Sequence, residues 1–141
     1  MLKNVPQSGK INKNRIELSD NKRHLMSDAI AVFEELSTAN SKSIGMITIN
    51  AEQTLNSLSL DMVDLIQAKL SDWESNNSIS CVFLQSAGEK AFCAGGDVRQ
   101  LYDSIVEAED GDNHYALGFF QREYTLNHHI PTHPLATFCR N

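Results

Sequence analysis

The chain has 141 residues, 41% of them apolar and 21% charged, which is typical of one globular domain with a modest core. Its formal net charge is −6, and because phosphate contacts need clustered Lys and Arg, we expect no nucleic-acid partner. No run approaches the roughly 18–20 apolar residues needed to cross a bilayer, so we also expect no membrane partner.

Basic residues gather at the N-terminus. Residues 1–23 hold six Lys and Arg against two acidic residues, which leaves +4 on this stretch and −10 on the remainder. We expect residues 1–27 to form a disordered tail and residues 28–141 to form the folded part. Two other interpretations stay open, namely a targeting presequence and a start at Met26 instead of Met1.

The three cysteines are Cys81, Cys93 and Cys139, an odd number, and two of them lie in apolar strand-like runs. This pattern favours reduced, buried thiols over a disulfide framework, and hence a reducing compartment. The expected localisation is cytoplasmic, with the mitochondrial matrix as the alternative.

Alternating apolar residues predict two strands at 31–37 and 44–50, joined as a hairpin. A nearly continuous apolar run at 79–84 is typical of a strand buried on both faces of a parallel sheet. Residues 135–139 resemble a further strand. Because helix-like segments separate the later strands, the predicted fold class is α/β with crossover connections.

Three segments have helical periodicity, at residues 59–74, 98–108 and 115–128. Ser59 is predicted to be the N-cap of the first helix, and Pro131 and Pro134 are predicted to end the third. The apolar side chains expected to face the core are Met62, Leu65, Ile66, Leu70 and Trp73 in the first helix, and Leu101, Tyr102 and Ile105 in the second.

The segment from Lys90 to Arg99 places Gly95 and Gly96 between a strand-like and a helix-like run. Glycine lets backbone N–H groups approach a ligand that a Cβ would block. Donors that point outward at a strand-to-helix turn bind anions, and for a transient anion they form an oxyanion hole. The alternative for the glycine pair is tight packing of the strand against the helix.

The segment KAFCAGGD, from Lys90 to Asp97, resembles the first oxyanion-hole segment of the crotonase (enoyl-CoA hydratase) superfamily. The loop from Asn50 to Leu58 ends in LNSL and resembles that family's N-x-x-x-x-L-N-A-L segment. The stretch FFQREYTLN, from Phe119 to Asn127, resembles F-F-R-E-E-Y-x-L-N of the 3-hydroxyisobutyryl-CoA hydrolase branch. The resemblance covers about residues 32–141 and implies an incomplete crotonase-like ββα spiral fold, the N-terminal half.

The resemblance also implies roles for individual residues. The Gly96 amide would supply one oxyanion N–H, and Glu123 would contact the hydroxyl of the acyl portion. The backbone at Ser57 and Ala94 would hold the adenine end of coenzyme A, although the family has Ala where Ser57 stands. Asp97 is expected to cap the following helix and not to contact the substrate.

The reaction implied is hydrolysis of 3-hydroxyisobutyryl-CoA to 3-hydroxyisobutyrate and CoA, a step of valine breakdown. The alternatives are a hydratase or isomerase of the same superfamily and a non-catalytic truncated fragment. The family takes its second oxyanion donor and its catalytic carboxylates from further along the chain, so we expect the isolated chain, which stops at Asn141, to be inactive. The expected partner is an acyl-CoA, with no cofactor beyond that CoA, and family members commonly form homo-oligomers.

Two other groups of residues invite a chemical role. Cys93 lies beside the glycine pair, but no base is adjacent in sequence, so we expect it to pack. His129 and His133 would share a helix face with a metal between them. Pro131 lies between the two, and the sequence shows no carboxylate or thiolate to complete a ligand set, so we expect no metal site.

Overall fold

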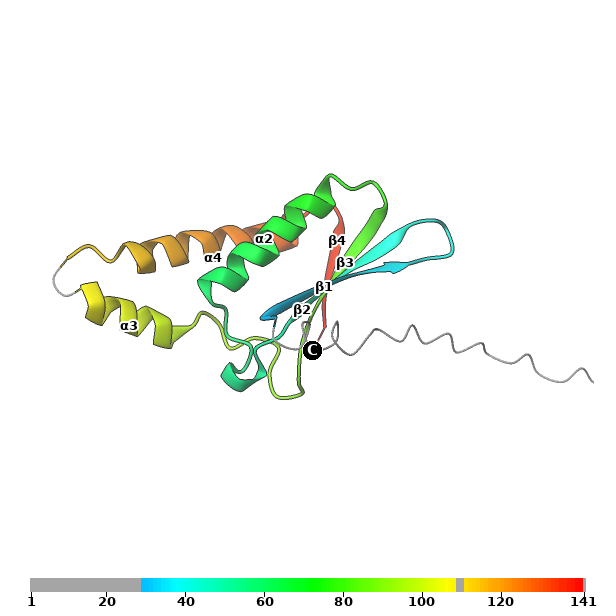
Figure 1. The fold of residues 1–141 in the computed structure, drawn as a ribbon. Helices are drawn as coiled ribbons and strands as arrows, with labels where there is room; N and C mark the ends of the chain where they lie inside the picture. Colours follow the sequence, from blue (N-terminus) through cyan, green and yellow to red (C-terminus); the bar gives the residue numbers. More distant parts are fainter. Residues whose placement is uncertain (1–28, 109–110, 141) are drawn as a thin grey trace, which may run out of the picture.

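The computed structural model describes residues 29–108 and 111–140 (Figure 1). The tail predicted at residues 1–27 and the choice between Met1 and Met26 lie outside the described residues. In chain order, the elements are β1 (Ala31–Ser37), β2 (Ser43–Ile49), η1 (Glu52–Thr54), α2 (Leu60–Glu74), β3 (Ile79–Ser86), α3 (Val98–Ala108), α4 (His114–Thr132) and β4 (Ala136–Arg140). The predicted order of strands and helices is confirmed, and η1 adds a short 3-10 turn after β2.

The four strands form one sheet in the order β1-β2-β3-β4. β1 and β2 pair antiparallel, as the predicted hairpin requires, whereas β2–β3 and β3–β4 pair parallel. The helices lie in the connections between the parallel strands, α2 before β3 and the α3–α4 pair before β4. The α/β class with crossover connections is therefore confirmed.

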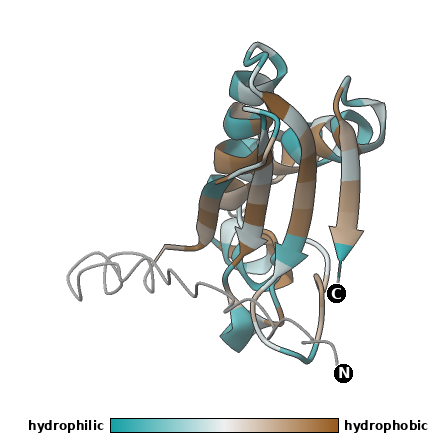
Figure 2. Cartoon of the chain, turned by 90° about the vertical axis from the view of Figure 1, so that its right-hand side faces the viewer, coloured by the Kyte–Doolittle hydropathy of each residue, from teal (hydrophilic) through white to brown (hydrophobic). Residues whose placement is uncertain are grey.

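Helices α2 and α4 lie side by side against one face of this sheet (Figure 1). The strand residues that face them are buried, and the middle strands are largely apolar (Figure 2). On β3, Val82 and Leu84 are buried, whereas Cys81 and Phe83 are half-buried. The prediction of burial on both faces was therefore wrong, because in the described part of the chain the helices cover one face of the sheet.

Helix α2 supplies most of the helical contribution to the core. Its buried apolar residues are Met62, Val63, Ile66, Leu70 and Trp73. Four of these were predicted from periodicity. Leu65 was placed on the same stripe, but it is 45% exposed, and Val63 takes the inward position instead.

Helix α3 differs from the expectation of an inward apolar face. Leu101 packs against the core, but Tyr102 is 65% exposed and Ile105 is 57% exposed, so their predicted burial was wrong. The helix contacts α4 and lies away from the sheet (Figure 1). Its apolar stripe therefore faces outward over much of its length.

Helix starts follow local capping chemistry. The Met62 amide donates to the Ser59 hydroxyl over 3.2 Å, which confirms Ser59 as an N-cap. The amides of Arg99 and Gln100 donate to Oδ1 of Asp97, each over 3.1 Å. Asp97 therefore caps α3, as expected.

The end of α4 was predicted too early. The helix continues through Pro131 to Thr132. Proline lacks an N–H and leaves one carbonyl in the preceding turn without its helical donor. The Thr132 hydroxyl donates to the carbonyl oxygen of His128 over 2.7 Å and so supplies an additional hydrogen bond within this last turn.

All three cysteines are free thiols, as predicted, but Cys139 is exposed and its expected burial was wrong. Within residues 29–108 and 111–140, no helix combines the length and the hydropathy that a membrane span requires.

Trp73 of α2 packs directly against Gly45 of β2. Trp73 is fully buried, and its indole N–H donates to Oε1 of Glu35 over 2.9 Å. A Cβ added to Gly45 would lie 2.6 Å from the Trp73 ring. The absence of a side chain at Gly45 thus allows α2 to approach β2.

We predict that Gly45→Ala lowers the free energy of unfolding by about 1–3 kcal/mol, because the methyl group overpacks a rigid indole. Urea unfolding followed by fluorescence of Trp73, the single tryptophan, measures this. Gly118→Ala is the control. Gly118 lies in α4 with open space at its Cβ position, so alanine there should raise stability by up to about 1 kcal/mol. Equal effects of the two substitutions would contradict the packing argument.

Candidate active site

The buried side chain of Asn56 holds two loops together. Its amide nitrogen donates to the carbonyl oxygens of Ala87 and Ala91, each over 2.9 Å, and its Oδ1 accepts from the Ala51 amide over 3.0 Å. Asn56 is 1% exposed and has a φ of 56°, a left-handed conformation that asparagine tolerates better than most residues. The loops after β2 and after β3 are therefore fastened to each other beneath the glycine pair. No role for Asn56 was assigned from the sequence.

A short parallel bridge joins Leu58 to Gly96. The Leu58 amide donates to the Gly95 carbonyl over 2.8 Å, and the Asp97 amide donates to the Leu58 carbonyl over 2.9 Å. Gly95 has a φ of 94°, where a side chain would be strained. Gly95 therefore makes the bend, and the bridge fixes its direction.

The bridge determines where the Gly96 amide points. The C=O and N–H of one peptide group point in opposite directions, so the Gly95 carbonyl faces Leu58 and the Gly96 N–H faces away from it. We find no acceptor for this N–H among the described residues. The amide remains available for a ligand, which is the property that an oxyanion donor needs.

Helix α4 lies close to Gly96. A Cβ on Gly96 would lie 2.9 Å from the ring of Phe119 and 3.6 Å from Oε1 of Glu123. Phe119 is 1% exposed, and Glu123 is half-buried. The fold thus brings a carboxylate from one motif beside the glycine of another, 27 positions away in sequence.

Ser57 and Ala94 lie on the two loops that Asn56 joins. The Ala94 amide donates to the Leu55 carbonyl over 3.1 Å, and the Ser57 amide donates to the Thr54 carbonyl over 3.2 Å. Their N–H groups are thus used internally. The carbonyl oxygens of Ser57 and Ala94 meet no donor in the part of the chain that the structure describes, and they are the groups that could accept from an adenine amino group.

Cys93 has a structural contact at the bend. Its sulfur accepts from the Gly95 amide over 3.4 Å, and the residue packs against the core. In the described segments, no histidine or carboxylate is hydrogen-bonded to it. The geometry at Cys93 agrees with a packing role and not with a nucleophile activated by a base.

A hollow of about 610 Å³ lies between the start of α2 and the facing parts of α3 and α4. Four carboxylates line it: Asp61, Asp103, Glu107 and Asp112. Gly96, Ser57, Ala94 and Glu123 do not line it. The hollow and the glycine bend are therefore separate places.

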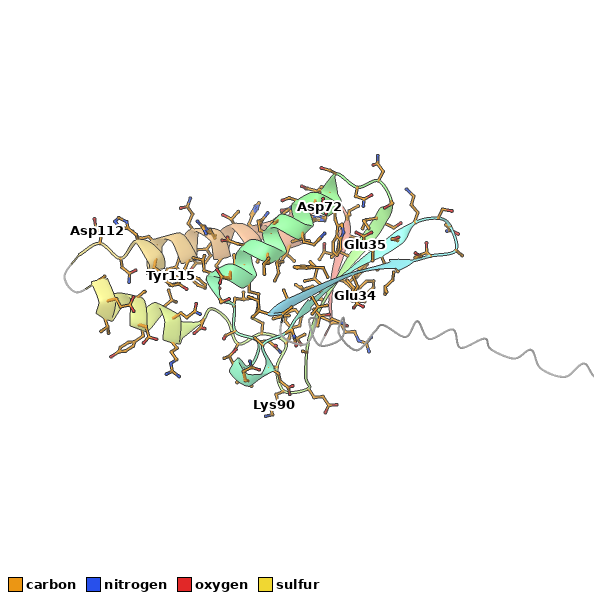
Figure 3. The ribbon with its side chains drawn as sticks, in the orientation of Figure 1. Glu34, Glu35, Asp72, Lys90, Asp112 and Tyr115 are labelled. Atoms are coloured by element: carbon orange, nitrogen blue, oxygen red, sulfur yellow. The ribbon has the colours of Figure 1, made fainter. Side chains whose placement is uncertain are left out.

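Tyr115 lines this hollow from α4 (Figure 3). Its hydroxyl donates to Oε1 of Gln100 on α3 over 2.7 Å. Burial, followed by the negative charges of Asp97 and Asp61, raises the pKa of Tyr115 above the ordinary value of 10.0. The folded protein thus favours the neutral phenol.

The structure brings a carboxylate to the two histidines that the sequence analysis left without one. Glu74, at the end of α2, lies with His129 and His133, and one possible ligand atom from each is within 4.8 Å of the other two. The expectation that no carboxylate completes the set was wrong. Glu74 is 55 positions from His129 in sequence, so no local motif could indicate the contact.

We predict that Asn56→Ala lowers the free energy of unfolding by about 2–3 kcal/mol, because it leaves buried carbonyl oxygens without donors. Urea unfolding measures the loss. Asn77→Ala is the control, because Asn77 is exposed and contributes only its carbonyl oxygen, to Lys42. The control should change stability by less than about 0.5 kcal/mol. An Asn56→Ala protein as stable as the control would refute the fastening role.

We predict that Tyr115 titrates above the ordinary tyrosine pKa and that Asp61→Asn moves its pKa back toward that value. Phenolate absorbance at 295 nm reports it in a Tyr102→Phe, Tyr124→Phe background, which leaves one tyrosine. Because the folded-state pKa is raised, the associated stability is present below the unfolded pKa and is lost as pH rises through the folded value. A normal titration that Asp61→Asn does not move would contradict the assigned cause.

A family model described as Enoyl-CoA hydratase/isomerase matches residues 44–139. The protein named "3-hydroxyisobutyryl-CoA hydrolase, mitochondrial" of Danio rerio is 38% identical over 113 residues, which cover 78% of this chain and 27% of that protein. The Homo sapiens protein of the same name is 38% identical over 97 residues, which cover 69% of this chain and 24% of that protein. The chain thus spans about a quarter of the length of these relatives.

Solved structures give the same family. A carnitinyl-CoA dehydratase from Mycobacterium thermoresistibile aligns with a TM-score of 0.68 and 31% identity, over 79% of this chain and 30% of that chain. An enoyl-CoA hydratase from Rhodobacter sphaeroides 2.4.1 aligns with a TM-score of 0.68 and 28% identity, over 79% and 31% respectively. Since the family model covers the chain from β2 to β4 and the sheet and helices align with these structures, the chain belongs to the enoyl-CoA hydratase/isomerase family and has the crotonase-like fold.

Proposed function

We propose that this chain is the part of a 3-hydroxyisobutyryl-CoA hydrolase that supplies one oxyanion donor, the adenine contacts and a substrate-orienting carboxylate. The free Gly96 amide beside Glu123 is the observation that carries the proposal. The names of the 38% identical relatives support the choice of reaction. Their names also include "mitochondrial", so we propose the mitochondrial matrix as the compartment and valine breakdown as the process.

The chemistry at Gly96 follows from the thioester. When water attacks the carbonyl carbon, negative charge moves to the carbonyl oxygen before the carbon–sulfur bond breaks and the CoA thiol leaves. A fixed N–H aimed at that oxygen stabilises the charge without reorganisation, and losing one such donor costs about 3–4 kcal/mol of barrier. The Leu58–Gly96 bridge and the Asn56 contacts hold this N–H in its direction.

Glu123 would determine which acyl group is favoured. Oε1 of Glu123 lies 3.6 Å from the position that a Cβ on Gly96 would take, so its carboxylate is close to the proposed oxyanion donor. A hydroxyl on the acyl portion can donate to this carboxylate, and a hydrogen bond to a charged group contributes about 1.5–3 kcal/mol. Acyl groups without that hydroxyl would lose this contact.

The carbonyl oxygens of Ser57 and Ala94 would accept from the adenine amino group at the other end of coenzyme A. Their amides already bond within the protein, whereas their carbonyl oxygens meet no donor among the described residues. An acceptor pair suits an amino donor and does not suit a phosphate, which needs donors or cations.

The second candidate is a hydratase or isomerase, because the aligned solved structures carry such names. Both reactions use the same oxyanion stabilisation. They differ in outcome, because hydration leaves the thioester intact, whereas hydrolysis releases a free thiol. The Gly96 motif supplies one of the two donors that the reaction needs, so we propose that the 141-residue chain binds the thioester without turning it over.

Calorimetric titration of the 141-residue chain with 3-hydroxyisobutyryl-CoA and isobutyryl-CoA tests the assignment. We expect the hydroxylated thioester to bind about tenfold more tightly or better, and we expect Glu123→Ala to remove this preference. Glu34→Ala, at an exposed glutamate on β1, is the control and should keep it. Equal binding of the two thioesters by the unmodified chain would refute the role of Glu123.

A thiol-release assay with the same chain distinguishes the reactions. We expect no release, and turnover by the chain alone would contradict the half-site argument. Tighter binding of crotonyl-CoA than of 3-hydroxyisobutyryl-CoA would favour the hydratase or isomerase.

A further inference from the structure

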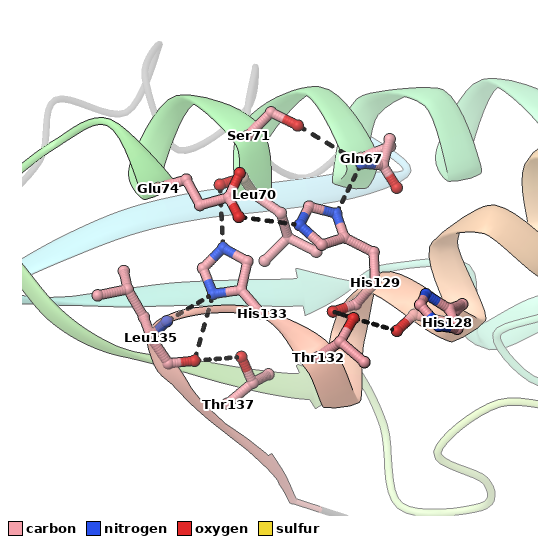
Figure 4. Close-up of polar contacts among 10 residues, drawn as sticks. All are labelled: Gln67, Leu70, Ser71, Glu74, His128, His129, Thr132, His133, Leu135 and Thr137. Carbon is pink, nitrogen blue, oxygen red and sulfur yellow. Dashed lines mark hydrogen bonds and ion pairs between the residues drawn. The ribbon is translucent and has the colours of Figure 1, made fainter.

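We propose that Glu74, His129 and His133 bind a zinc ion, or a first-row divalent ion of similar chemistry, that connects the end of α2 to the end of α4 (Figure 4). The site lies on different residues from the thioester contacts, and it does not depend on the proposed reaction. The rings of both histidines and the carboxylate converge from the two helices (Figure 4).

The geometry is close to that of a metal site. The distance from Nε2 of His129 to Oε1 of Glu74 is 3.6 Å, and the ligand atoms of all three residues lie within 4.8 Å of one another. Four ligands at about 2.1 Å around zinc lie roughly 3.4 Å apart. The pair that is already at 3.6 Å needs little adjustment. The side chain of Glu74 is 34% exposed, so it can move to shorten the longer distances between the three ligand atoms.

The fold fixes the histidines. His129 and His133 are four positions apart across the last turn of α4, and their ring centroids are 5.1 Å apart. His133 is 7% exposed and His129 has a side chain that is 16% exposed. Both rings are therefore held in place before any ion arrives. The C-terminal end of α2, where Glu74 lies, also favours a cation through its helix dipole.

Gln67, the neighbour of His129, can determine which ring nitrogen of His129 carries the proton. Nδ1 of His129 lies 2.6 Å from the amide nitrogen of Gln67, whose Oε1 is buried and has no hydrogen-bond partner among the described residues. If the Gln67 amide is turned over, Oε1 accepts from an Nδ1–H of His129. That tautomer leaves the Nε2 lone pair directed at Glu74. Metal-bound histidines usually donate their other N–H to an oxygen in this way.

His133 is hydrogen-bonded within the protein on both sides of its ring. The Leu135 amide donates to Nδ1 over 3.2 Å, and in this tautomer Nε2–H donates to the carbonyl oxygen of Leu70 over 3.1 Å. Binding of an ion at Nε2 replaces the bond to Leu70 and moves the ring proton to Nδ1, which lies 3.2 Å from the Leu135 carbonyl oxygen and can donate to it.

The ligand set indicates the ion. Two imidazoles and a carboxylate bind zinc with one position left for water, and imidazole also suits copper, nickel and cobalt. Calcium and magnesium prefer oxygen ligands, so they are poor candidates. An ion here would fasten α2 to α4 on the side away from η1.

The test uses the 141-residue chain without a histidine tag. We expect calorimetry with Zn²⁺ to show one site, and Zn²⁺ to raise the melting temperature. Co²⁺ should give visible bands of a four-coordinate ion without a thiolate charge-transfer band, which excludes Cys81, Cys93 and Cys139 as ligands. A thiolate band, or no saturable binding at micromolar Zn²⁺, would overturn the proposal.

Substitutions locate the ion. Glu74→Gln and His129→Ala should each weaken Zn²⁺ binding at least tenfold, and Gln67→Ala should weaken it about tenfold through the orientation of His129. His128→Ala is the matched control, because His128 is exposed on the same helix and should bind as before. If His129→Ala fails to fold, Glu74→Gln decides, because Glu74 is at the exposed end of α2. Unchanged affinity in Glu74→Gln would overturn the site.

Discussion

The side-chain amide of Asn56 is the contact on which the glycine bend depends. Its nitrogen donates to two carbonyl oxygens in the loop after β3, and its oxygen accepts from an amide in the loop after β2. One buried side chain therefore joins two segments that are far apart in sequence. Buried polar groups must be paired, and here the pairing itself specifies the loop geometry. Leu58 can then pair with Gly96, and the Gly96 amide points away from Leu58. The chemistry proposed for that amide follows from a structural residue that does not contact the thioester in the proposal.

The elements and their order could be predicted from the sequence because each depends on local pattern. Alternation in β2, periodicity in α2 and the caps at Ser59 and Asp97 involve residues within one or two turns of each other. The resemblance at the glycine pair also predicted the family to which the chain belongs, and the family model confirms it. The roles of Gly96, Glu123, Ser57 and Ala94 in the candidate site stay predictions, although the fold places Glu123 beside Gly96.

What the sequence could not predict depends on contacts across long separations. An amphipathic pattern shows that α3 has an apolar face, but the neighbour that would cover Tyr102 and Ile105 is a property of the tertiary arrangement. The prediction that β3 is buried on both faces was wrong for the same reason. Pro131 is a strong signal to end a helix, yet the last turn persists with a side-chain hydrogen bond from Thr132. Glu74 joins the histidines only because α2 and α4 pack side by side.

Helix α4 carries Phe119 and Glu123 against the glycine bend and His129 against the end of α2, and His133 follows directly after its last residue. Glu123 and His129 are six positions apart, a rise of about 9 Å along the helix axis. Because one helix runs between the two proposed sites, a ligand that shifted α4 at one of them would change affinity at the other, and thermodynamic reciprocity would make the factor the same in both directions.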